Sequence, residues 1–519
     1  MQGYNPGTIE DALHKGLQKS ARIEASMKMG LLNGWTAPLA AGLMASGALV
    51  SGFGAGALAQ EAEPKTEAPT NLLPQTLEGQ EASPAQAPAE MGNEPEATAP
   101  TGAFETAFPA MVSNPVDQSD LEPVGPPLQP WSLSAVQALI AYIEGIGAEG
   151  LDPADYDLQA LQTSLQSGPS AELDALASKN FVWLVEDIRD GRTPMEARKQ
   201  WFVVDPDRDL YRTETLLAEA TYTGDVAAVL DRLHPVHADY LALREELAVT
   251  PLEDDARRKL IRANMDRWRW LARDLGTIHL ITNVPEYQLR LRAGAKTFTY
   301  KTIVGKPGRT ATPQLAEKVS GVVFNPTWTV PQSIVVGEGL GQRVLNDPVY
   351  AKKNGYKATK SDSGWITVVQ QPGPGNSLGR MKLEMPNRHA IFFHDTPTRW
   401  MFSKDARALS HGCIRTERAL ELAMTVAILG KAASKDEAVE IATSGKYTKV
   451  FLEEGKQIPA YITYFTMGTN TDGELTTFKD IYGRDAPVLA SLDQPREENR
   501  ATVSDDEVIV IENNPLAGG

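Results

Sequence analysis

Residues 390–416 read AIFFHDTPTRWMFSKDARALSHGCIRT and contain the one cysteine of the chain, Cys413. The apolar residues at the start of the stretch are typical of a buried strand, which brings His394 to its end. After the cysteine, apolar residues recur at helical spacing over 420–428, and Gly430 follows. The stretch therefore predicts a strand that ends at His394, a turn that carries the thiol, and a helix that ends near Gly430.

The thiol of Cys413 can be interpreted in two ways. A free cysteine is often a small buried apolar group, and the residue count alone favours that interpretation. Thr416, however, is placed to cap the following helix, and a helix N-terminus or a nearby imidazole lowers a thiol pKa. Gly412 permits a tight turn in which the backbone N–H groups of Gly412 and Cys413 face a developing oxyanion. These features together predict a reactive thiolate at the start of a helix.

Two histidines compete for the role of general base. His411 is two residues from Cys413, so on an extended segment both side chains point to the same side. His394 comes from another strand and can approach the sulfur from across the site. A metal site made of these three side chains is the alternative, but the chain has no second cysteine and no carboxylate at zinc-motif spacing. The sequence thus predicts neither a metal nor a cofactor.

Composition limits the classes of function. The 519 residues have a net charge of −17, which argues against a nucleic-acid partner because phosphate binding needs a dense basic surface. Hydrophobic residues make up 42% of the chain, which is enough for a globular core, and the length allows more than one domain. A single cysteine excludes an intramolecular disulfide.

The N-terminal residues 1–59 predict export from the cytoplasm. Basic residues as far as Lys28 are followed by a run without charges that continues to Gln60 and contains Ala57-Leu58-Ala59. The small residues of this tripeptide fit a signal-peptide cleavage site, while the length of the run also fits an N-terminal membrane anchor. Residues 60–128, rich in Ala, Pro and Glu, then predict a disordered linker.

Periodicity divides the rest of the chain. Helical spacing predicts a helical domain over 129–250 and a connecting helix over 251–276. Short strands between Gly/Pro turns predict a mostly-β domain over 277–484, and its insertion at about 325–375 is typical of a binding loop or lid. The acidic segment 485–519 is predicted to be a disordered tail. The predicted fold class is α+β.

His394, fifteen intervening residues and then Ser410-His411-Gly412-Cys413 form a signature. It resembles that of the L,D-transpeptidase (YkuD) catalytic-domain family. Arg415 stands where many members have Asn, and this feature is similar to the YcbB-like subgroup. The similarity extends over about 130–485 and includes the motifs NMDRWRW at 264–270, VGKP at 304–307, NPTWTVP at 325–331, PGNSLGR at 374–380, HDTP at 394–397 and DIYGRD at 480–485.

The resemblance implies a mostly-β catalytic domain with a capping lid, preceded by a helical scaffold domain. It implies that Cys413 is the nucleophile, that His394 is the general base, and that His411 supports the site by hydrogen bonding. It also implies that the backbone carbonyl of Asp395 orients the His394 ring. The matched motifs add further substrate-binding or supporting residues: Ser410, Arg415, Asp395, Thr396, Asn376 and Gly379.

One feature of the subgroup is missing. Its members usually carry a small peptidoglycan-binding helical module between the scaffold and the helix of residues 264–270. Here the predicted helix that ends at Ala248 runs almost directly into Ile261, which leaves no room for that module. Substrate capture must then depend on the lid and the scaffold.

The resemblance implies remodelling of peptidoglycan in the periplasm, by an enzyme that is either released or anchored in the inner membrane. Cys413 would form a thioester with a donor tetrapeptide stem, and an acceptor amine would then give a 3–3 crosslink. Carbapenem-type inhibitors are expected to acylate Cys413. The alternatives are L,D-carboxypeptidase or other cell-wall cysteine peptidase activity, or attachment of a protein amine to peptidoglycan. Sortase-like enzymes, NlpC-type enzymes and a non-catalytic envelope scaffold fit these residues less well.

Overall fold

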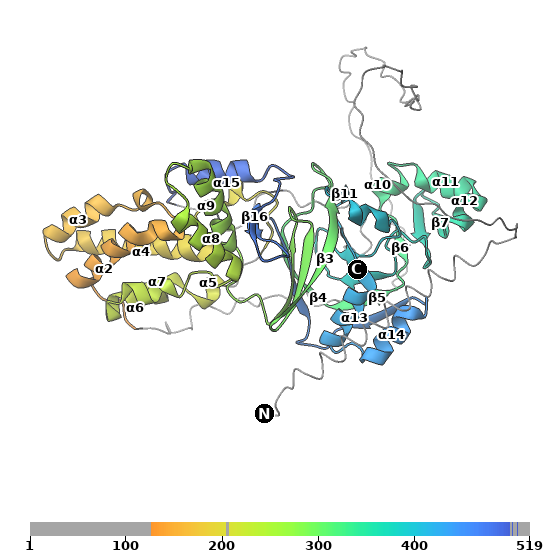
Figure 1. The fold of residues 1–519 in the computed structure, drawn as a ribbon, viewed down its shortest axis with the longest axis horizontal. Coiled ribbons are helices and arrows are strands. Elements are labelled where there is room, and N and C mark those ends of the chain that lie inside the picture. The colour runs from red at the N-terminus through yellow and green to blue at the C-terminus, as the bar shows by residue number, and fades with distance from the viewer. Residues whose placement is uncertain (1–125, 204–206, 499–500, 502–505, 507–519) are drawn as a thin grey trace, which may run out of the picture. The chain divides into compact units, whose positions relative to one another are not determined.

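The computed structural model describes residues 126–203 and 207–498, together with residues 501 and 506 (Figure 1). The predicted export segment 1–59 and nearly all of the predicted linker 60–128 lie outside the described residues. Among the helices that the structure describes, none is long and apolar enough to cross a membrane. The described chain forms helices first and then a mostly-β region, which confirms the predicted α+β fold class.

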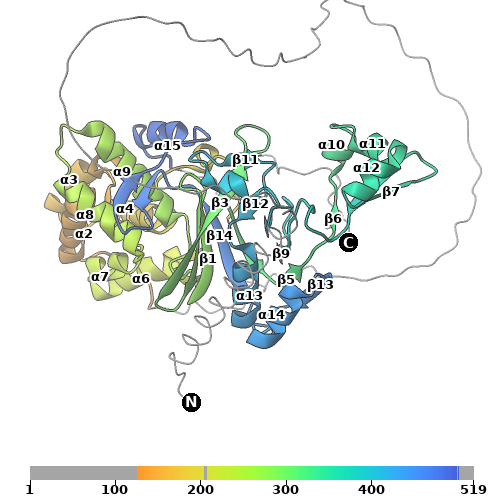
Figure 2. The same ribbon diagram turned by 45° about the vertical axis from the view of Figure 1, so that its right-hand side comes forward.

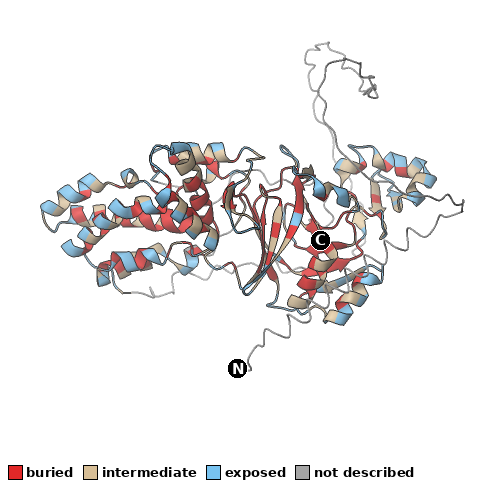
Figure 3. Cartoon of the chain, in the orientation of Figure 1, coloured by how far each residue is buried: buried red, intermediate tan, exposed pale blue. Residues whose placement is uncertain are grey.

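The helical domain is built from helices whose apolar faces pack together. Ser132 and Ser170 begin two of them, because each hydroxyl accepts a hydrogen bond from a first-turn backbone N–H. Leu139 and Phe181 belong to the buried core between the helices, and Figure 3 shows the buried residues along their facing sides. The helices are α2 (Leu133–Gly145), α3 (Leu158–Gln166), α4 (Ala171–Asp190), α5 (Asp207–Leu210), α6 (Thr213–Thr223), α7 (Val226–Asp231), α8 (Ala238–Val249) and α9 (Asp255–Arg269).

Helices α8 and α9 follow each other almost directly. Helix α8 ends at Val249, and Asp254 caps α9 by accepting a hydrogen bond from the backbone N–H of Arg257. Only residues 250–254 separate the two helices, so no further module fits between them, as the sequence predicts.

A buried polar network fixes α9 within the helical domain. The Asp266 carboxylate accepts hydrogen bonds from the backbone N–H groups of Arg192 (2.6 Å) and Thr193 (3.0 Å) and from the indole N–H of Trp270 (3.0 Å). The Arg269 guanidinium lies 3.4 Å from the same carboxylate, and both side chains are only 1% exposed. Removing one partner of such a pair leaves a buried charge without compensation.

Replacing Asp266 with alanine is therefore expected to lower the free energy of unfolding by about 3–5 kcal/mol, because it removes a carboxylate partner of the buried Arg269 guanidinium and the acceptor of three N–H donors. Urea unfolding followed by tryptophan fluorescence measures this loss. Asp255→Ala is the matched control on the same helix, since that carboxylate is 72% exposed. A loss no larger for Asp266→Ala than for the control would contradict the role given to the network.

The β domain is organised around one large sheet. Its strands lie in the order β13-β5-β9-β10-β12-β3-β2-β1-β14-β4, with β11 paired to β3. Helix α13 (Ala419–Leu429) packs on the sheet, where Leu422 and Val426 share a core with Phe324. Helix α14 (Lys435–Thr443) follows it. The strands are β1 (Ile278–Asn283), β2 (Gln288–Ala293), β3 (Lys296–Gly305), β4 (Leu315–Val319), β5 (Gly321–Phe324), β9 (Met381–Glu384), β10 (Phe393–His394), β11 (Ala408–Ser410), β12 (Ile414–Thr416), β13 (Thr448–Phe451) and β14 (Ile458–Thr463).

The insertion between β5 and β9 has its own small fold. It contains α10 (Gln332–Val335), α11 (Leu340–Asn346), α12 (Pro348–Lys353) and the three-stranded sheet β6-β8-β7, made of β6 (Trp328–Thr329), β7 (Tyr356–Lys360) and β8 (Ile366–Gln370). Figure 2 shows these helices and β7 gathered together. Val330, Val335, Val344 and Val368 form their separate buried core. We call residues 325–375 the lid.

Three local predictions differ from the structure. The strand that ends at His394 is only two residues long, because the Asn387 side chain bonds both backbone groups of Ile391 in place of a neighbouring strand. Helix α13 begins at Ala419, well after the predicted cap. The predicted disordered tail is wrong at its start, where α15 (Asp485–Leu492) buries Val488 and Leu492 against the core that includes residues of α9.

Candidate functional site

Cys413 lies in the turn between β11 and β12. The hydroxyl of Ser410 holds this turn: it donates to the backbone carbonyl of Cys413 (2.6 Å) and accepts from the backbone N–H of Gly412 (3.2 Å). The Cys413 Sγ lies 3.5 Å from the backbone carbonyl oxygen of Ala390, which belongs to the loop before β10. Ser410 therefore fixes the turn that carries Cys413 through the backbone.

Gly412 is required by the geometry of the turn. Its φ is +116°, a region that side-chain-bearing residues avoid, and a Cβ there would lie 3.1 Å from Ile391 Cδ1. Its N–H group is already bonded to Ser410, so the prediction that this group faces an oxyanion is wrong for this structure. The backbone N–H of Cys413 has no hydrogen-bond partner among the described residues and is the better candidate donor.

Thr312, in the loop between β3 and β4, supports the same turn and was not predicted. Its hydroxyl donates to the Gly412 carbonyl (2.7 Å) and accepts from the Gly305 N–H (2.9 Å). The Tyr482 hydroxyl accepts from the Thr312 N–H (3.2 Å) and donates to the Gly305 carbonyl (2.6 Å). Tyr482 lies in the motif at 480–485, but no local pattern marks Thr312.

His394 is held in one tautomer. Its Nδ1 lies 2.6 Å from the backbone carbonyl oxygen of Asp395, so Nδ1–H donates and Nε2 remains as the proton acceptor. This is the contact that the resemblance implies. Burial lowers the pKa of His394 to about 3, and the charges of Arg415 and Lys382 act in the same direction. The imidazole is therefore neutral at neutral pH and able to accept a proton.

The pKa of Cys413 differs from the prediction. Strand β12 stands between the cysteine and α13, and Thr416 is paired with Thr302 of β3 and does not cap the helix. The thiol thus gains nothing from a helix N-terminus. Burial raises its pKa to about 11, although the backbone N–H of Phe392 and the charges of Lys382 and Arg415 oppose that effect. The resting pair is a neutral thiol and a neutral imidazole.

Alkylation of the resting enzyme by iodoacetamide tests this protonation state. Because only the thiolate reacts, a pKa of about 11 predicts a rate that rises about tenfold per pH unit from pH 7 to pH 10 without a plateau. Cys413 is the one thiol in the chain, so intact-mass measurements report on it alone. A plateau below pH 8 would show a stabilised thiolate and contradict this assignment.

A cavity of about 610 Å³ lies between the thiol and the lid. Cys413, His394 and Arg415 line it from the large sheet, and the lid contributes Trp328 and Glu338 among others. The cavity thus contains both the predicted nucleophile and the proton acceptor.

Residues 277–458 match the L,D-transpeptidase catalytic domain, YkuD. The chain carries an L,D-transpeptidase catalytic domain. Residues 131–247 match the Scaffold domain, and this combination is that of YcbB-like proteins, as the motifs predict. A protein of Haemophilus influenzae with the name "Putative L,D-transpeptidase" is 30% identical over 227 residues. The match covers 40% of this chain and 45% of that protein, so the chain spans less than half the length of this curated relative.

In the L,D-transpeptidase domain, Gly379 leaves the space that the Asp395 side chain occupies. Gly379 has a φ of +63°, and a Cβ there would lie 2.4 Å from the Asp395 carboxyl group. That carboxyl group accepts a hydrogen bond from the backbone N–H of Arg380 (2.9 Å) and lies 3.5 Å from the Arg399 guanidinium. Since the Asp395 carbonyl orients His394, Gly379 supports the position of this histidine indirectly.

Asn376 closes the base of the lid. Its amide donates to the backbone carbonyls of Pro326 (3.0 Å) and Gln371 (3.0 Å), which lie at the two ends of the insertion. Its carbonyl oxygen accepts from the Leu378 N–H (2.8 Å). Asn376 is only 1% exposed and links the two chain segments that connect the lid to the sheet.

The remaining predicted residues have different surroundings. His411 is exposed, and its Nε2 lies 3.8 Å from the Glu338 carboxylate of the lid, which is too far for a hydrogen bond. Its predicted supporting hydrogen bond is therefore not formed in this structure. Arg415 lines the cavity and approaches Met401 Sδ (3.6 Å). Thr396 is buried and bonded to the Thr398 hydroxyl (2.8 Å), so it shapes the loop behind His394.

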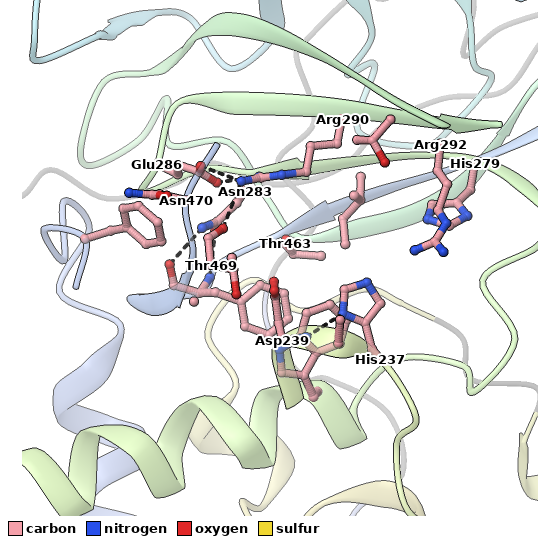
Figure 4. Close-up of a pocket in the computed structure, with 17 residues that line it drawn as sticks. His237, Asp239, His279, Asn283, Glu286, Arg290, Arg292, Thr463, Thr469 and Asn470 are labelled. Carbon is pink, nitrogen blue, oxygen red and sulfur yellow. Dashed lines mark hydrogen bonds and ion pairs between the residues drawn. The ribbon is translucent and has the colours of Figure 1, made fainter. Parts of the chain in front are cut away.

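A second, smaller cavity of about 200 Å³ lies beside the start of α8 (Figure 4). His237 stacks there on Trp268, with ring centroids 4.0 Å apart. Arg290 forms a two-point ion pair with Glu286 (2.5 and 2.6 Å). No cysteine lines this cavity, so the nucleophile predicted from the sequence, Cys413, lies at the first one.

Proposed function

We propose that the protein forms 3–3 crosslinks in peptidoglycan through a thioester on Cys413. The observation that carries this proposal is that Cys413 and a neutral His394, held in one tautomer by the Asp395 carbonyl, line the same cavity beneath the lid. A neutral thiol that shares a cavity with a proton acceptor requires general-base activation at the moment of attack.

The reaction has two acyl-transfer steps. The Cys413 sulfur attacks the carbonyl carbon at the L-centre of diaminopimelate, and its proton passes to His394 Nε2. His394 then protonates the nitrogen of the terminal D-Ala, which leaves, and a thioester remains. An acceptor amine attacks the thioester and gives its proton to His394, which returns one to the departing thiolate. The amide bond formed replaces the one broken.

The backbone N–H of Cys413 is the proposed donor to the oxyanion in both steps. One positioned donor of this kind typically contributes about 3 kcal/mol to transition-state stabilisation. The lid lines one side of the cavity, and by limiting the access of water it would favour the amine as acceptor. With water as acceptor the same site would act as an L,D-carboxypeptidase, and with a protein amine it would attach that protein to peptidoglycan.

The proposed place of action is the periplasm, where the stem peptides are found. The evidence for export is the basic and then uncharged N-terminal sequence, which predicts a signal peptide or an inner-membrane anchor. The proposed partners are a donor tetrapeptide stem and an acceptor amine, with carbapenem-type inhibitors as acylating analogues. The proposed process is cell-wall biogenesis and remodelling, with an effect on cell shape.

Muropeptide analysis separates these activities. The purified protein is incubated with disaccharide tetrapeptide, and the products are separated by chromatography and identified by mass spectrometry. Crosslinked 3–3 dimers are the expected product. Tripeptide alone, with no dimers at any substrate concentration, would show a carboxypeptidase and contradict the crosslinking proposal.

A further inference from the structure

One face of the large sheet carries a row of basic side chains that passes through His394. Strand pairing places Arg415 and Lys382 directly beside His394, and Val323 stands between Lys382 and Lys449. Residues paired directly across neighbouring strands have side chains on the same face. The cavity of about 610 Å³ is lined by all five of these residues, namely His394, Arg415, Lys382, Val323 and Lys449. With strands about 4.8 Å apart, the row extends about 14 Å from the histidine to Lys449.

A carboxylate is inserted between the two lysines of this row. Glu384 lies two residues after Lys382 on β9 and therefore on the same face. The Lys382 ammonium is 3.2 Å from one Glu384 oxygen, and the Lys449 ammonium is 3.7 Å from the other. The order of charges along the floor of the cavity is thus positive, negative, positive.

These three groups keep unused binding capacity. An ammonium has three donors, and the contact between Lys449 and Glu384 is longer than a hydrogen bond. Lys382 has one carboxylate partner and otherwise lies 4.5 Å above the Phe392 ring. The Lys382 and Glu384 side chains are 11% and 10% exposed, so a ligand that pairs with them does so in a largely water-excluded place.

The whole cavity is cationic although the chain is strongly acidic. Apart from its histidines, four cations line it (Arg343, Lys382, Arg415 and Lys449) against two carboxylates (Glu338 and Glu384). Such a lining attracts ligands with carboxylates. The alternation of charge within it fits a ligand that offers both signs at one point.

We propose that Lys382, Glu384 and Lys449 recognise a zwitterionic head group, a single carbon that bears both an ammonium and a carboxylate. The ammonium pairs with Glu384 and the carboxylate with the lysines. This inference rests on the proposed function, in which the acylating residue is diaminopimelate. The side chain of that residue ends in such a carbon, about 5 Å from the carbon beside the scissile carbonyl when extended.

Lys382 lies close to the catalytic residues that the resemblance implies. The Phe392 ring centroid lies 5.6 Å from that of His394, and the Lys382 ammonium lies 4.5 Å from the Phe392 centroid. The Phe392 ring thus neighbours both the Lys382 ammonium and the His394 ring. The Lys382 charge also acts to lower the pKa of both His394 and Cys413, so it lies near the reacting atoms.

Three synthetic donor tetrapeptides test the inference. They carry at the third position diaminopimelate, its side-chain carboxamide, or lysine, which has the ammonium but no carboxylate. For the natural enzyme, kcat/KM is expected to fall at least about tenfold for the carboxamide and the lysine donor, because a desolvated charge loses its partner. Lys449→Met should lower kcat/KM for the diaminopimelate donor by a similar factor and remove much of the preference among donors.

Lys431→Met is the matched control, since Lys431 lies 3.8 Å from Glu453 and lines no part of this cavity. It should retain both the rate and the preference. If the diaminopimelate donor is turned over but the three donors react equally, the inference is wrong while the proposed function stands. The Lys449→Met change and the carboxamide donor should remove the same interaction. If their combined effect on kcat/KM equals the product of their separate effects, the inference is also wrong. If no donor is turned over, the proposed function itself falls and this inference falls with it.

Discussion

Cys413→Ala is expected to abolish transpeptidation, with kcat lower by at least about 10⁴-fold, because no other nucleophile can form the acyl-enzyme. The chain contains no second cysteine that could replace it. The change removes one half-buried sulfur from a turn that Ser410 and Thr312 hold through backbone bonds. The thermal unfolding midpoint should therefore change little. Release of D-Ala measured by coupled assay, together with calorimetry, checks both parts.

A stable Cys413→Ala protein that still releases D-Ala at more than about one hundredth of the natural rate would contradict the assignment of the nucleophile. A variant that fails to fold would be uninformative on activity, and Cys413→Ser then provides the second reading. Serine keeps the size and the hydrogen bonding of the turn, but its hydroxyl is a far weaker nucleophile than a thiolate.

His394→Gln should lower kcat/KM by about 10²–10⁴-fold, the usual contribution of a general base. Glutamine can replace the hydrogen bond to the Asp395 carbonyl but cannot accept the thiol proton. The loss should be smaller when the thiol is already ionised, so the variant should recover part of its activity as pH rises towards the thiol pKa of about 11. A pH profile of kcat/KM for both proteins measures this recovery.

His237→Gln is the control for this experiment. His237 is another largely buried histidine whose pKa burial lowers to about 4, but it lines the second cavity and not the one with Cys413. It should leave kcat/KM within about twofold of the natural value at temperatures where the protein is folded. Equal losses for the two variants would mean that His394 acts only on the fold.

Short sequence patterns predicted those parts of the site that depend on residues close together in the sequence. The residues around Cys413 predicted the turn that carries the thiol, although not the strand β12 that follows it, and the helical and β regions follow their periodicities. The Asp395 carbonyl contact was implied by the resemblance, and the structure contains it. Gly379 and Gly412 stand at positive φ, where the motif glycines are needed.

Contacts between residues far apart in the sequence determine the features that the sequence patterns did not predict. Thr416 looks like a helix cap, but pairing with Thr302 keeps it in a strand, and α13 begins three residues later. The thiol pKa depends on burial, which no local pattern reveals. The start of the tail becomes helical because Asp485 forms an ion pair with the buried Arg267 (2.7 Å) and Val488 is buried.

The most direct test of the account is the detection of the acyl-enzyme itself. The protein is mixed with donor tetrapeptide in the absence of an acceptor, quenched in acid, digested and analysed by mass spectrometry. The thioester mechanism predicts a tripeptide adduct, lacking the terminal D-Ala, on the peptide that contains Cys413. Turnover of the donor with no adduct on Cys413, even at millisecond quench times, would contradict a thioester mechanism.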